Sequence, residues 1–266
     1  MKDITKIKEL LERRYCKAYC GVRDSSFCPK DHCSCSVAAE TKAYMDSIIP
    51  KPYSSMSLKD LHGRDKEGRM IVNEHILRRA KTQLSKYCWK GIDINNLEKY
   101  SVSDFNSRSI MHQRRTDGDN LVIYSDENMD DTPVGGKTFI ASLIMKEAIK
   151  DRVIRGSITE SYDWIQYSVL KDKIINDPDS MSDTRCCDWL VVDDIVSEAQ
   201  STRNQRSFVS SKLNSFFNER AEDGLPTIFV FRFDVTLDHS AIEDYYGLTL
   251  AKIIKNSHKI SLTTGR

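Results

Sequence analysis

The sequence predicts an α/β fold in which helices cover both faces of a parallel sheet. Two kinds of segment alternate: short apolar runs at 121–124, 190–192, 227–231 and 258–262, and helix-length segments at 138–149, 203–223 and 245–256. Buried parallel strands are typically near-continuous apolar runs, and their alternation with helices indicates a sheet covered on both sides. We expect one further strand between Val153 and Ser161.

The N-terminal third has a different organisation. Apolar residues from Ile4 to Tyr15 recur at helical spacing and predict a first helix. The segment 49–66 contains Pro50 and Pro52 and is interpreted as a linker. Residues 71–89 predict an amphipathic helix. The expected division is therefore an N-terminal lobe at 1–48, a linker with a basic amphipathic helix at 49–95, and a larger domain at 96–266.

Composition narrows the class of protein. Apolar residues make up 39% and charged residues 30% of the chain, which excludes a disordered tail. The longest uncharged apolar runs are far shorter than the ~20 residues that a bilayer requires. The first residues are charged and lack an apolar leader. We therefore expect a cytoplasmic protein with no membrane partner.

Charge is distributed unevenly along the chain. Residues 51–118 carry fourteen Lys/Arg against eight Asp/Glu, a net charge of +6, whereas residues 119–266 carry seventeen against twenty-four, a net charge of −7. The polar face of the amphipathic helix holds Arg78, Arg79, Lys81 and Lys86, and Arg114 and Arg115 follow. This basic segment indicates either contact with single-stranded DNA or a solvated helix face. Tyr87 and Trp89 are available to stack on bases, although core packing is favoured for both.

Five of the eight cysteines lie within twenty residues. They are Cys16, Cys20, Cys28, Cys33 and Cys35, with the spacing C-x3-C-x7-C-x4-C-x-C. Clustered thiols in a protein without a secretion signal indicate a metal site, and a structural Zn²⁺ takes four such ligands. An iron–sulfur cluster and free thiols are the alternatives, and the sequence does not choose which four cysteines bind. Metal would stabilise a lobe too small to have a core of its own.

A glycine-rich loop lies between a predicted strand and a predicted helix. Gly135, Gly136, Lys137, Thr138 and Phe139 follow the 121–124 strand and open an apolar helix. This is the context of a P-loop, in which backbone N–H groups and the helix N-terminus hold phosphate. Lys137 would reach the β- and γ-phosphates of ATP, and the Thr138 hydroxyl would bind Mg²⁺.

Two carboxylates end the next apolar strand. Asp193 and Asp194 follow the run Trp189 to Val192. Ligands of parallel sheets gather at the carboxyl ends of the strands. We therefore expect Asp193 near the magnesium and Asp194 beside it, where it orients the attacking water.

These motifs resemble those of AAA+ ATPases of the bacterial replicative helicase-loader type, DnaC and DnaI, and of their IstB-type relatives. The resemblance covers residues 96–262. Gly136-Lys137-Thr138 and Leu190–Asp194 are similar to Walker A and Walker B, and 218–228 is similar to the helix, turn and fourth strand of this family. The resemblance implies a three-layer P-loop fold of the AAA+, ASCE type. A zinc-bearing N-terminal lobe that binds the helicase also occurs among DnaI-type loaders.

Three positions depart from the family pattern. Asp131 stands in place of the first P-loop glycine, and Arg232 follows the fourth strand in place of a polar sensor. Lys252 occupies the position of the arginine finger, and lysine lacks the planar fork of arginine. Arg220 and Arg232 are alternatives for the finger. We expect these changes to affect hydrolysis more than nucleotide binding.

The resemblance implies an ATP-dependent loader that places a hexameric replicative helicase at the replication fork. Such a protein would bind single-stranded DNA and assemble into a ring or spiral. A virus-encoded version would act in the cytoplasm of its bacterial host. The alternatives are an IstB-type transposition helper ATPase and a nucleotide-binding adaptor that does not hydrolyse ATP.

Overall fold

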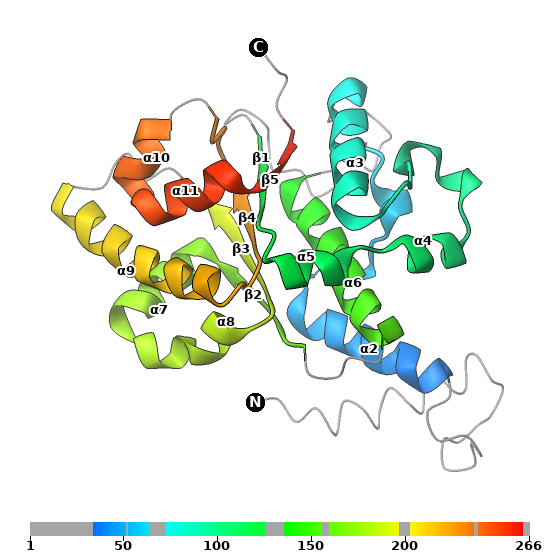
Figure 1. Cartoon of the computed structure of the whole chain (residues 1–266), viewed down its shortest axis with the longest axis horizontal. Coiled ribbons are helices and arrows are strands. Elements are labelled where there is room, and N and C mark those ends of the chain that lie inside the picture. Colours follow the sequence, from blue (N-terminus) through cyan, green and yellow to red (C-terminus); the bar gives the residue numbers. More distant parts are fainter. Residues whose placement is uncertain are drawn as a thin grey trace.

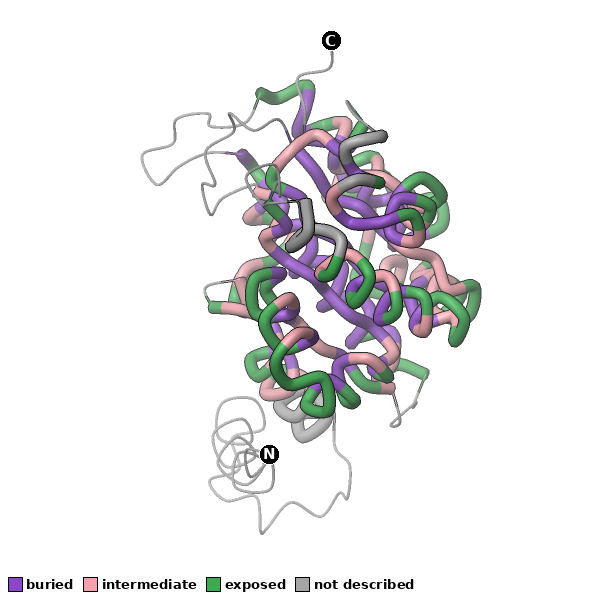
Figure 2. Tube along the Cα trace, turned by 90° about the vertical axis from the view of Figure 1, so that its left-hand side faces the viewer, coloured by how far each residue is buried: buried purple, intermediate pink, exposed green. Residues whose placement is uncertain are grey.

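Five parallel strands form a single sheet at the centre of the protein. The computed structural model describes residues 34–51, 53–63, 73–125, 136–155, 160–196, 203–236 and 239–262. The strands are β1 (Leu121–Tyr124), β2 (Tyr162–Gln166), β3 (Trp189–Ile195), β4 (Thr227–Phe231) and β5 (His258–Ser261), and their order in the sheet is β2-β3-β4-β1-β5. All described pairings between them are parallel. The strands occupy the buried centre of the molecule (Figure 2).

Helices cover both faces of this sheet, as Figure 1 shows. One layer consists of α2 (Ser34–Ile48), α3 (Glu74–Cys88), α4 (Val102–Arg108), α5 (Met111–Asp117) and α6 (Lys137–Arg155). The other consists of α7 (Tyr167–Asn176), α8 (Ser182–Cys186), α9 (Arg203–Glu222), α10 (His239–Tyr246) and α11 (Leu248–Asn256). Short 3-10 helices lie at Tyr53–Ser55, Leu58–Asp60, Ile94–Lys99 and Pro178–Met181.

Side chains that alternate along each strand contact the two helix layers in turn. Ile228 and Val230 of β4 pack in the core that contains α3 and α6, whereas Phe229 and Phe231 pack in the core that contains α7 and α9. This alternation follows from the two-residue period of a strand. The three-layer α/β prediction is therefore confirmed.

The strand expected between Val153 and Ser161 is displaced. Helix α6 continues through Arg155, and the strand begins only at Tyr162. The helix expected at 245–256 is also interrupted, because α10 ends at Tyr246 and α11 starts at Leu248. Gly247 lies between them with φ of 86°, a conformation that glycine adopts readily, and a side chain there would collide with Asn214.

The described part of the segment expected to be a linker packs into the core. Ile49 and Leu61 are buried with α6 and the sheet. The Lys146 ammonium of α6 donates hydrogen bonds to the backbone carbonyls of Tyr53 and Met56. Residues 49–51 and 53–63 therefore contribute to a core shared with the sheet, while the division of the chain into domains stays a prediction.

The amphipathic helix is confirmed as α3. Its buried residues include Ile76, Ala80, Leu84 and Tyr87, which the periodicity predicts, and also Leu77 and Cys88. It lies beside β5, where Arg79 Nη2 donates to Ser261 Oγ over 3.3 Å and the Ser261 amide donates to Gln83 Oε1 over 3.0 Å. Within the described ranges, no helix has the length and apolarity needed to cross a membrane.

Candidate functional site

The order of the strands brings three chain segments to one edge of the sheet. Strand β4 lies between β1 and β3, so the residues at the carboxyl ends of β1, β3 and β4 are neighbours. These residues are Ser125 just after β1, the pair Asp193–Asp194 near the end of β3, and Arg232 just after β4. Helix α6 begins at Lys137 after the β1 loop. The carboxyl edge of the sheet and the N-terminus of α6 therefore meet, which is where parallel sheets bind ligands.

Lys137 and Thr138 connect this helix to the strands. Lys137 is only 6% exposed, and its Nζ donates to Ser125 Oγ over 2.5 Å. Thr138 Oγ1 donates to Asp193 Oδ1 over 3.2 Å. A buried ammonium at a helix N-terminus attracts anions. The Thr138 hydroxyl and the Asp193 carboxylate beside this ammonium carry oxygens of the kind that Mg²⁺ takes as ligands. The residues present therefore fit a magnesium–phosphate group.

A β-bulge turns two successive carboxylates toward this point. Val192 of β3 pairs with Phe229, but Ile195 pairs with Phe231, so Asp193 and Asp194 together lie opposite one residue of β4. Asp194 has φ of 65°, a left-handed conformation that Asp tolerates better than most residues. Successive side chains of a regular strand point to opposite faces. The bulge changes this, and both carboxylates line the same cavity.

Asp193 has an altered pKa. Burial raises the pKa of this carboxyl to about 6, and the negative charge of Asp194 also raises it. Hydrogen bonds from the Thr138 hydroxyl, the Asp194 amide and the Trp164 side chain act in the opposite direction. Loss of hydration disfavours the charged form of a buried carboxyl. A divalent cation at this position would favour that charged form.

Arg232 is the positive group nearest to Asp194 on this edge. Its Nε forms an ion pair with Asp194 Oδ1, and both side chains are substantially exposed. Arg232 is held by the end of β4, where its backbone amide donates to the carbonyl of Ile195 over 2.9 Å. Asp194, the carboxylate expected to orient the attacking water, is therefore ion-paired with Arg232 in this structure.

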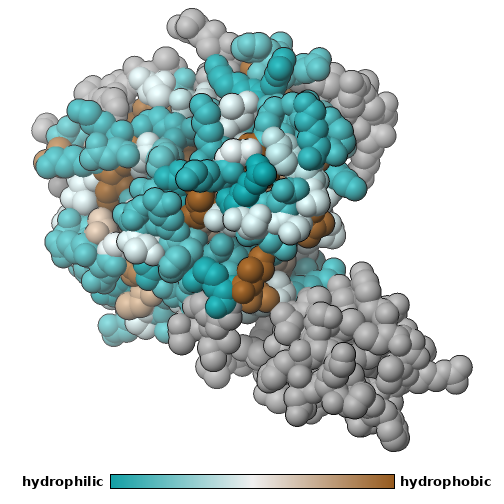
Figure 3. Space-filling view, turned by 45° about the vertical axis from the view of Figure 1, so that its right-hand side comes forward, coloured by the Kyte–Doolittle hydropathy of each residue, from teal (hydrophilic) through white to brown (hydrophobic). Residues whose placement is uncertain are grey.

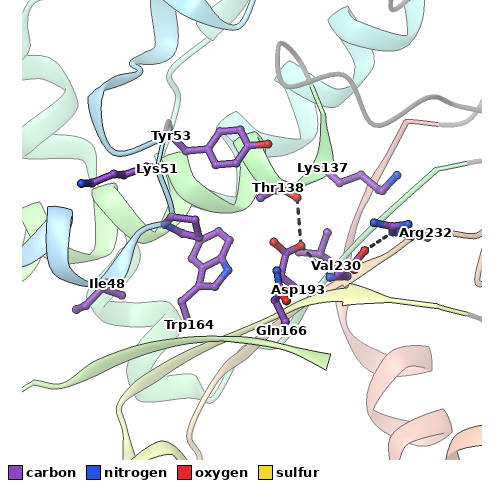
Figure 4. A pocket seen from close by; sticks show the side chains of 12 residues that line it. Ile48, Lys51, Tyr53, Lys137, Thr138, Trp164, Gln166, Asp193, Val230 and Arg232 are labelled. Atoms are coloured by element: carbon purple, nitrogen blue, oxygen red, sulfur yellow. Dashed lines mark hydrogen bonds and ion pairs between the residues drawn. The ribbon is translucent and has the colours of Figure 1, made fainter. Parts of the chain in front are cut away.

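These groups line a single cavity of about 460 Å³. Figure 4 shows Thr138, Asp193 and Arg232 directed toward its interior from α6, β3 and the end of β4. The described residues that line it are Ile48, Pro50, Lys51, Tyr53, Lys137, Thr138, Trp164, Gln166, Asp193, Asp194, Val230 and Arg232. The sequence predicted five of these together: Lys137, Thr138, Asp193, Asp194 and Arg232.

The remaining predicted residues are Gly135, Gly136, Phe139 and Lys252, together with Asp131 of the P-loop pattern. Gly135 and Asp131 fall outside the described residues, and Gly136 immediately precedes α6. Phe139 is fully buried in the core beneath the site. Lys252 is exposed on α11 and is not among the described residues that line the cavity, so a finger role for it would act on another copy of the chain.

Arg220 is excluded as an alternative finger because its guanidinium is used inside the fold. The residue is 1% exposed. Its Nε donates to Thr227 Oγ1, and its two terminal nitrogens donate to the carbonyls of Thr184, Arg185, Cys187 and Pro226. Arg220 thereby joins the end of α9 to the segments that precede β3 and β4. Within the 218–228 stretch, Arg220 therefore has a structural role.

The basic segment is also partly used within the fold. Arg114 Nη1 pairs with Asp119 over 2.6 Å, and Arg115 Nε donates to Asp188 over 2.8 Å. Tyr87 and Trp89 are both 2% exposed, which confirms their expected core packing. Arg78 and Lys86 remain exposed on α3. The face of the molecule drawn in Figure 3 is largely hydrophilic. DNA contact by the exposed face of α3 stays a proposal.

The predicted zinc ligands lie almost entirely beyond the described residues. Cys16, Cys20, Cys28 and Cys33 fall outside them, and Cys35 lies in the first turn of α2. In the part of the chain that is described, His, Cys, Asp and Glu side chains form no group of three or more that could hold a metal ion. Zinc binding by the cluster stays a prediction.

The sequence reasoning missed the half of the cavity formed by Ile48, Pro50, Lys51, Tyr53, Trp164 and Gln166. Trp164 and Gln166 lie at the carboxyl end of β2, so correct placement of that strand would have identified them through the rule that located Asp193. The residues of the 48–53 segment carry no local signal, because only tertiary packing brings them to the site.

The raised pKa of Asp193 predicts a pH-dependent cost to folding. Because the folded-state pKa is above the usual 3.8, the contribution of this carboxyl to stability without ligand is greatest at low pH and decreases as the pH rises through about 6. We expect Asp193→Asn to increase the free energy of unfolding by roughly 3 kcal/mol at pH 8, with the gain shrinking toward pH 4. Urea denaturation of nucleotide-free protein at several pH values measures this. A gain that is independent of pH would contradict it.

Comparison with solved structures finds chains that align with 80% of this one. The crystal structure of the DnaC helicase loader is 14% identical, with a TM-score of 0.47 over 80% of this chain and 99% of that one. DnaI is 14% identical, with a TM-score of 0.44 over 80% and 93%. A putative primosome component from Streptococcus pyogenes serotype M3 is 13% identical, with a TM-score of 0.41 over 80% and 88%. No family model and no curated protein matches the chain.

Proposed function

We propose that this chain binds ATP with Mg²⁺ and hydrolyses it. The observation that carries the proposal is the hydrogen bond from Thr138 to Asp193 beside the buried ammonium of Lys137, at the N-terminus of α6. Three groups that a metal–phosphate complex requires thus occupy one cavity: a cation, a hydroxyl and a carboxylate.

Each residue has a distinct role in this proposal. Lys137 binds the phosphates, and Thr138 and Asp193 would hold the magnesium. When bound, the metal supplies positive charge that offsets the charge on the phosphates. Asp194 orients the water molecule that attacks the terminal phosphate. Arg232, released from Asp194, binds that phosphate through its guanidinium.

We further propose that the ATPase serves as a loader for a hexameric replicative DNA helicase. The support is the sequence resemblance in the Walker A, Walker B and 218–228 segments. The N-terminal lobe, with zinc bound by its cysteines, would contact the helicase. Copies of the chain would assemble on single-stranded DNA, with Lys252 of one copy facing the nucleotide of the next.

Asp194→Asn tests the catalytic assignment. We expect ATP affinity to stay within about three-fold of the parent and turnover to fall at least roughly 100-fold, because the amide cannot accept a proton from water. Asparagine also tolerates the left-handed backbone at this position, so the fold is retained. Isothermal titration and phosphate release measure the two quantities, and Asp179→Asn, an exposed site in the Pro178–Met181 turn, is the matched control. Unchanged turnover contradicts the assignment.

The same variant tests the loader proposal. With ATP bound and hydrolysis slowed, the full chain should remain associated with a hexameric replicative helicase and with single-stranded DNA, as measured by mass photometry. Association that is equal with and without ATP would contradict an ATP-dependent loader.

A second candidate is a nucleotide-binding adaptor that does not hydrolyse ATP. The ion pair between Arg232 and Asp194 favours it, because a carboxylate held by a cation is less available to water. Binding of ATP by the parent without turnover, in the presence of helicase and DNA, would select this candidate.

A further inference from the structure

The chain that precedes the ATPase domain forms one wall of the proposed nucleotide cavity. Ile48, Pro50, Lys51 and Tyr53 line the cavity together with Thr138 and Asp193. Ile48 is the last residue of α2 and the other three follow it, and α2 carries Cys35 near its start. Part of the site is therefore built by residues outside both nucleotide motifs.

The position of this wall is fixed by packing. Ile49 is 2% exposed within the core shared with α6. Lys146 belongs to α6, and its ammonium donates hydrogen bonds to the backbone carbonyls of Tyr53 and Met56. Desolvation lowers the pKa of Lys146 to about 8, so this group is still largely protonated at neutral pH. The wall is thus attached to the helix that begins at the phosphate site.

Tyr53 is placed next to Thr138. Its ring stacks on that of Phe139, with centroids 6.3 Å apart and an interplanar angle of 19°. Phe139 is the residue after Thr138, and it is fully buried. Figure 4 shows the Tyr53 ring extending across the cavity, with its hydroxyl end on the side of Thr138 and Lys137. The stacked ring therefore holds a phenolic hydroxyl over the first turn of α6.

The proposed role of Asp194 would place the terminal phosphate in the cavity that this hydroxyl faces. The carboxylate that orients the attacking water must lie beside the terminal phosphate, and Asp194 lines the same cavity as Tyr53. Trp164, hydrogen-bonded to Asp193, forms another part of the lining. A phenolic hydroxyl can donate a hydrogen bond to a phosphate oxygen.

We propose that the hydroxyl of Tyr53 donates a hydrogen bond to the terminal phosphate of ATP. Through this bond the protein would distinguish ATP from ADP. The inference rests on the proposed nucleotide site and names a specificity-determining residue within it. Because Tyr53 belongs to the segment that follows α2, its contact links the presence of the third phosphate to the N-terminal part of the chain. Release of the phosphate removes that link.

Tyr53→Phe in the full chain tests the proposal, because it keeps the stacked ring and removes only the hydroxyl. The probes are ADP and an ATP analogue whose β–γ bridge cannot be hydrolysed, each titrated with Mg²⁺ by calorimetry. We expect the analogue to bind roughly ten-fold more weakly than to the parent, in keeping with a lost bond to a charged group. Affinity for ADP should stay within about two-fold.

Tyr44→Phe is the matched control. Tyr44 lies on α2 outside the cavity lining, where its ring contacts Tyr162 at 5.8 Å. It should leave the ratio of the two affinities unchanged. An unchanged ratio in Tyr53→Phe, whether both ligands bind as before or both weaken equally, overturns the proposal.

The nucleotide site and the role of Tyr53 fail in different ways. If the parent binds neither ligand, the proposed function itself is wrong. If the parent binds both and Lys137→Ala binds neither, the site stands, and the ratio measured for Tyr53→Phe alone decides the role of its hydroxyl.

Discussion

Lys137→Ala is expected to weaken ATP binding by at least roughly 100-fold, because the variant lacks the one described ammonium that is buried at the N-terminus of α6. A charge-assisted contact in a partly dehydrated site contributes more than one on the surface. The removed Nζ bonds Ser125 at the end of β1, so the loss is local to the phosphate site. Calorimetric titration of ATP with Mg²⁺ measures the effect.

Lys150→Ala is the matched control for this variant. Lys150 lies on the same helix but is exposed, and its Nζ is 3.8 Å from Glu147. We expect its ATP affinity to equal that of the parent. If Lys137→Ala binds ATP as the parent does, the Gly-Lys-Thr segment is not a nucleotide site.

Arg220→Ala is expected to destabilise the fold by about 3–5 kcal/mol. The substitution leaves several buried carbonyls without their donor and opens a cavity where the guanidinium joined α9 to the segments before β3 and β4. Urea denaturation followed by circular dichroism measures the loss. If the variant does not fold, thermal unfolding of Arg220→Lys, which keeps the charge but loses the fork, gives a smaller loss in the same direction.

Arg185→Ala provides the comparison for Arg220→Ala. Arg185 pairs with Glu219 at 2.8 Å, and both side chains are more than one third exposed. Ion pairs of this kind contribute about 0–1 kcal/mol. Equal losses for the two arginines would show that the buried bonds of Arg220 are not what stabilises this corner.

The sequence was informative wherever local pattern determines structure. The runs that became β1 and β4 are apolar on both faces, because these strands are buried between two helix layers. The rule that parallel strands bind ligands at their carboxyl ends then predicts that Lys137 and Asp193 lie in one site.

Strand β2 lacks this pattern because it is an edge strand. Its sequence, Tyr-Asp-Trp-Ile-Gln, includes Asp163, whose carboxylate accepts hydrogen bonds from the Thr184 hydroxyl and the Trp164 amide. These partners satisfy a charged side chain within a strand, but neither is visible as a periodicity. The sequence prediction therefore placed this strand too early in the chain, overlapping the end of α6.

Two further features depended on tertiary structure. The bulge at Asp193 and Asp194 appears only in the register between β3 and β4. The two prolines of the 49–66 segment indicated a linker, whereas Ile49 and Leu61 are core residues. Composition reports the local preference of a segment, whereas the structure of this one is determined by its packing against the rest of the core.

The central place of β1 in the sheet has a consequence for how the chain folds. Leu121 pairs with Ile228 on one side and with His258 on the other, and both partners come from much later in the chain. Contacts of such long sequence separation require a costly loop closure before they stabilise anything. During synthesis the backbone of β1 must therefore wait without its strand partners until both later strands have emerged. Slow refolding that a general chaperone accelerates is the behaviour to expect of such a topology.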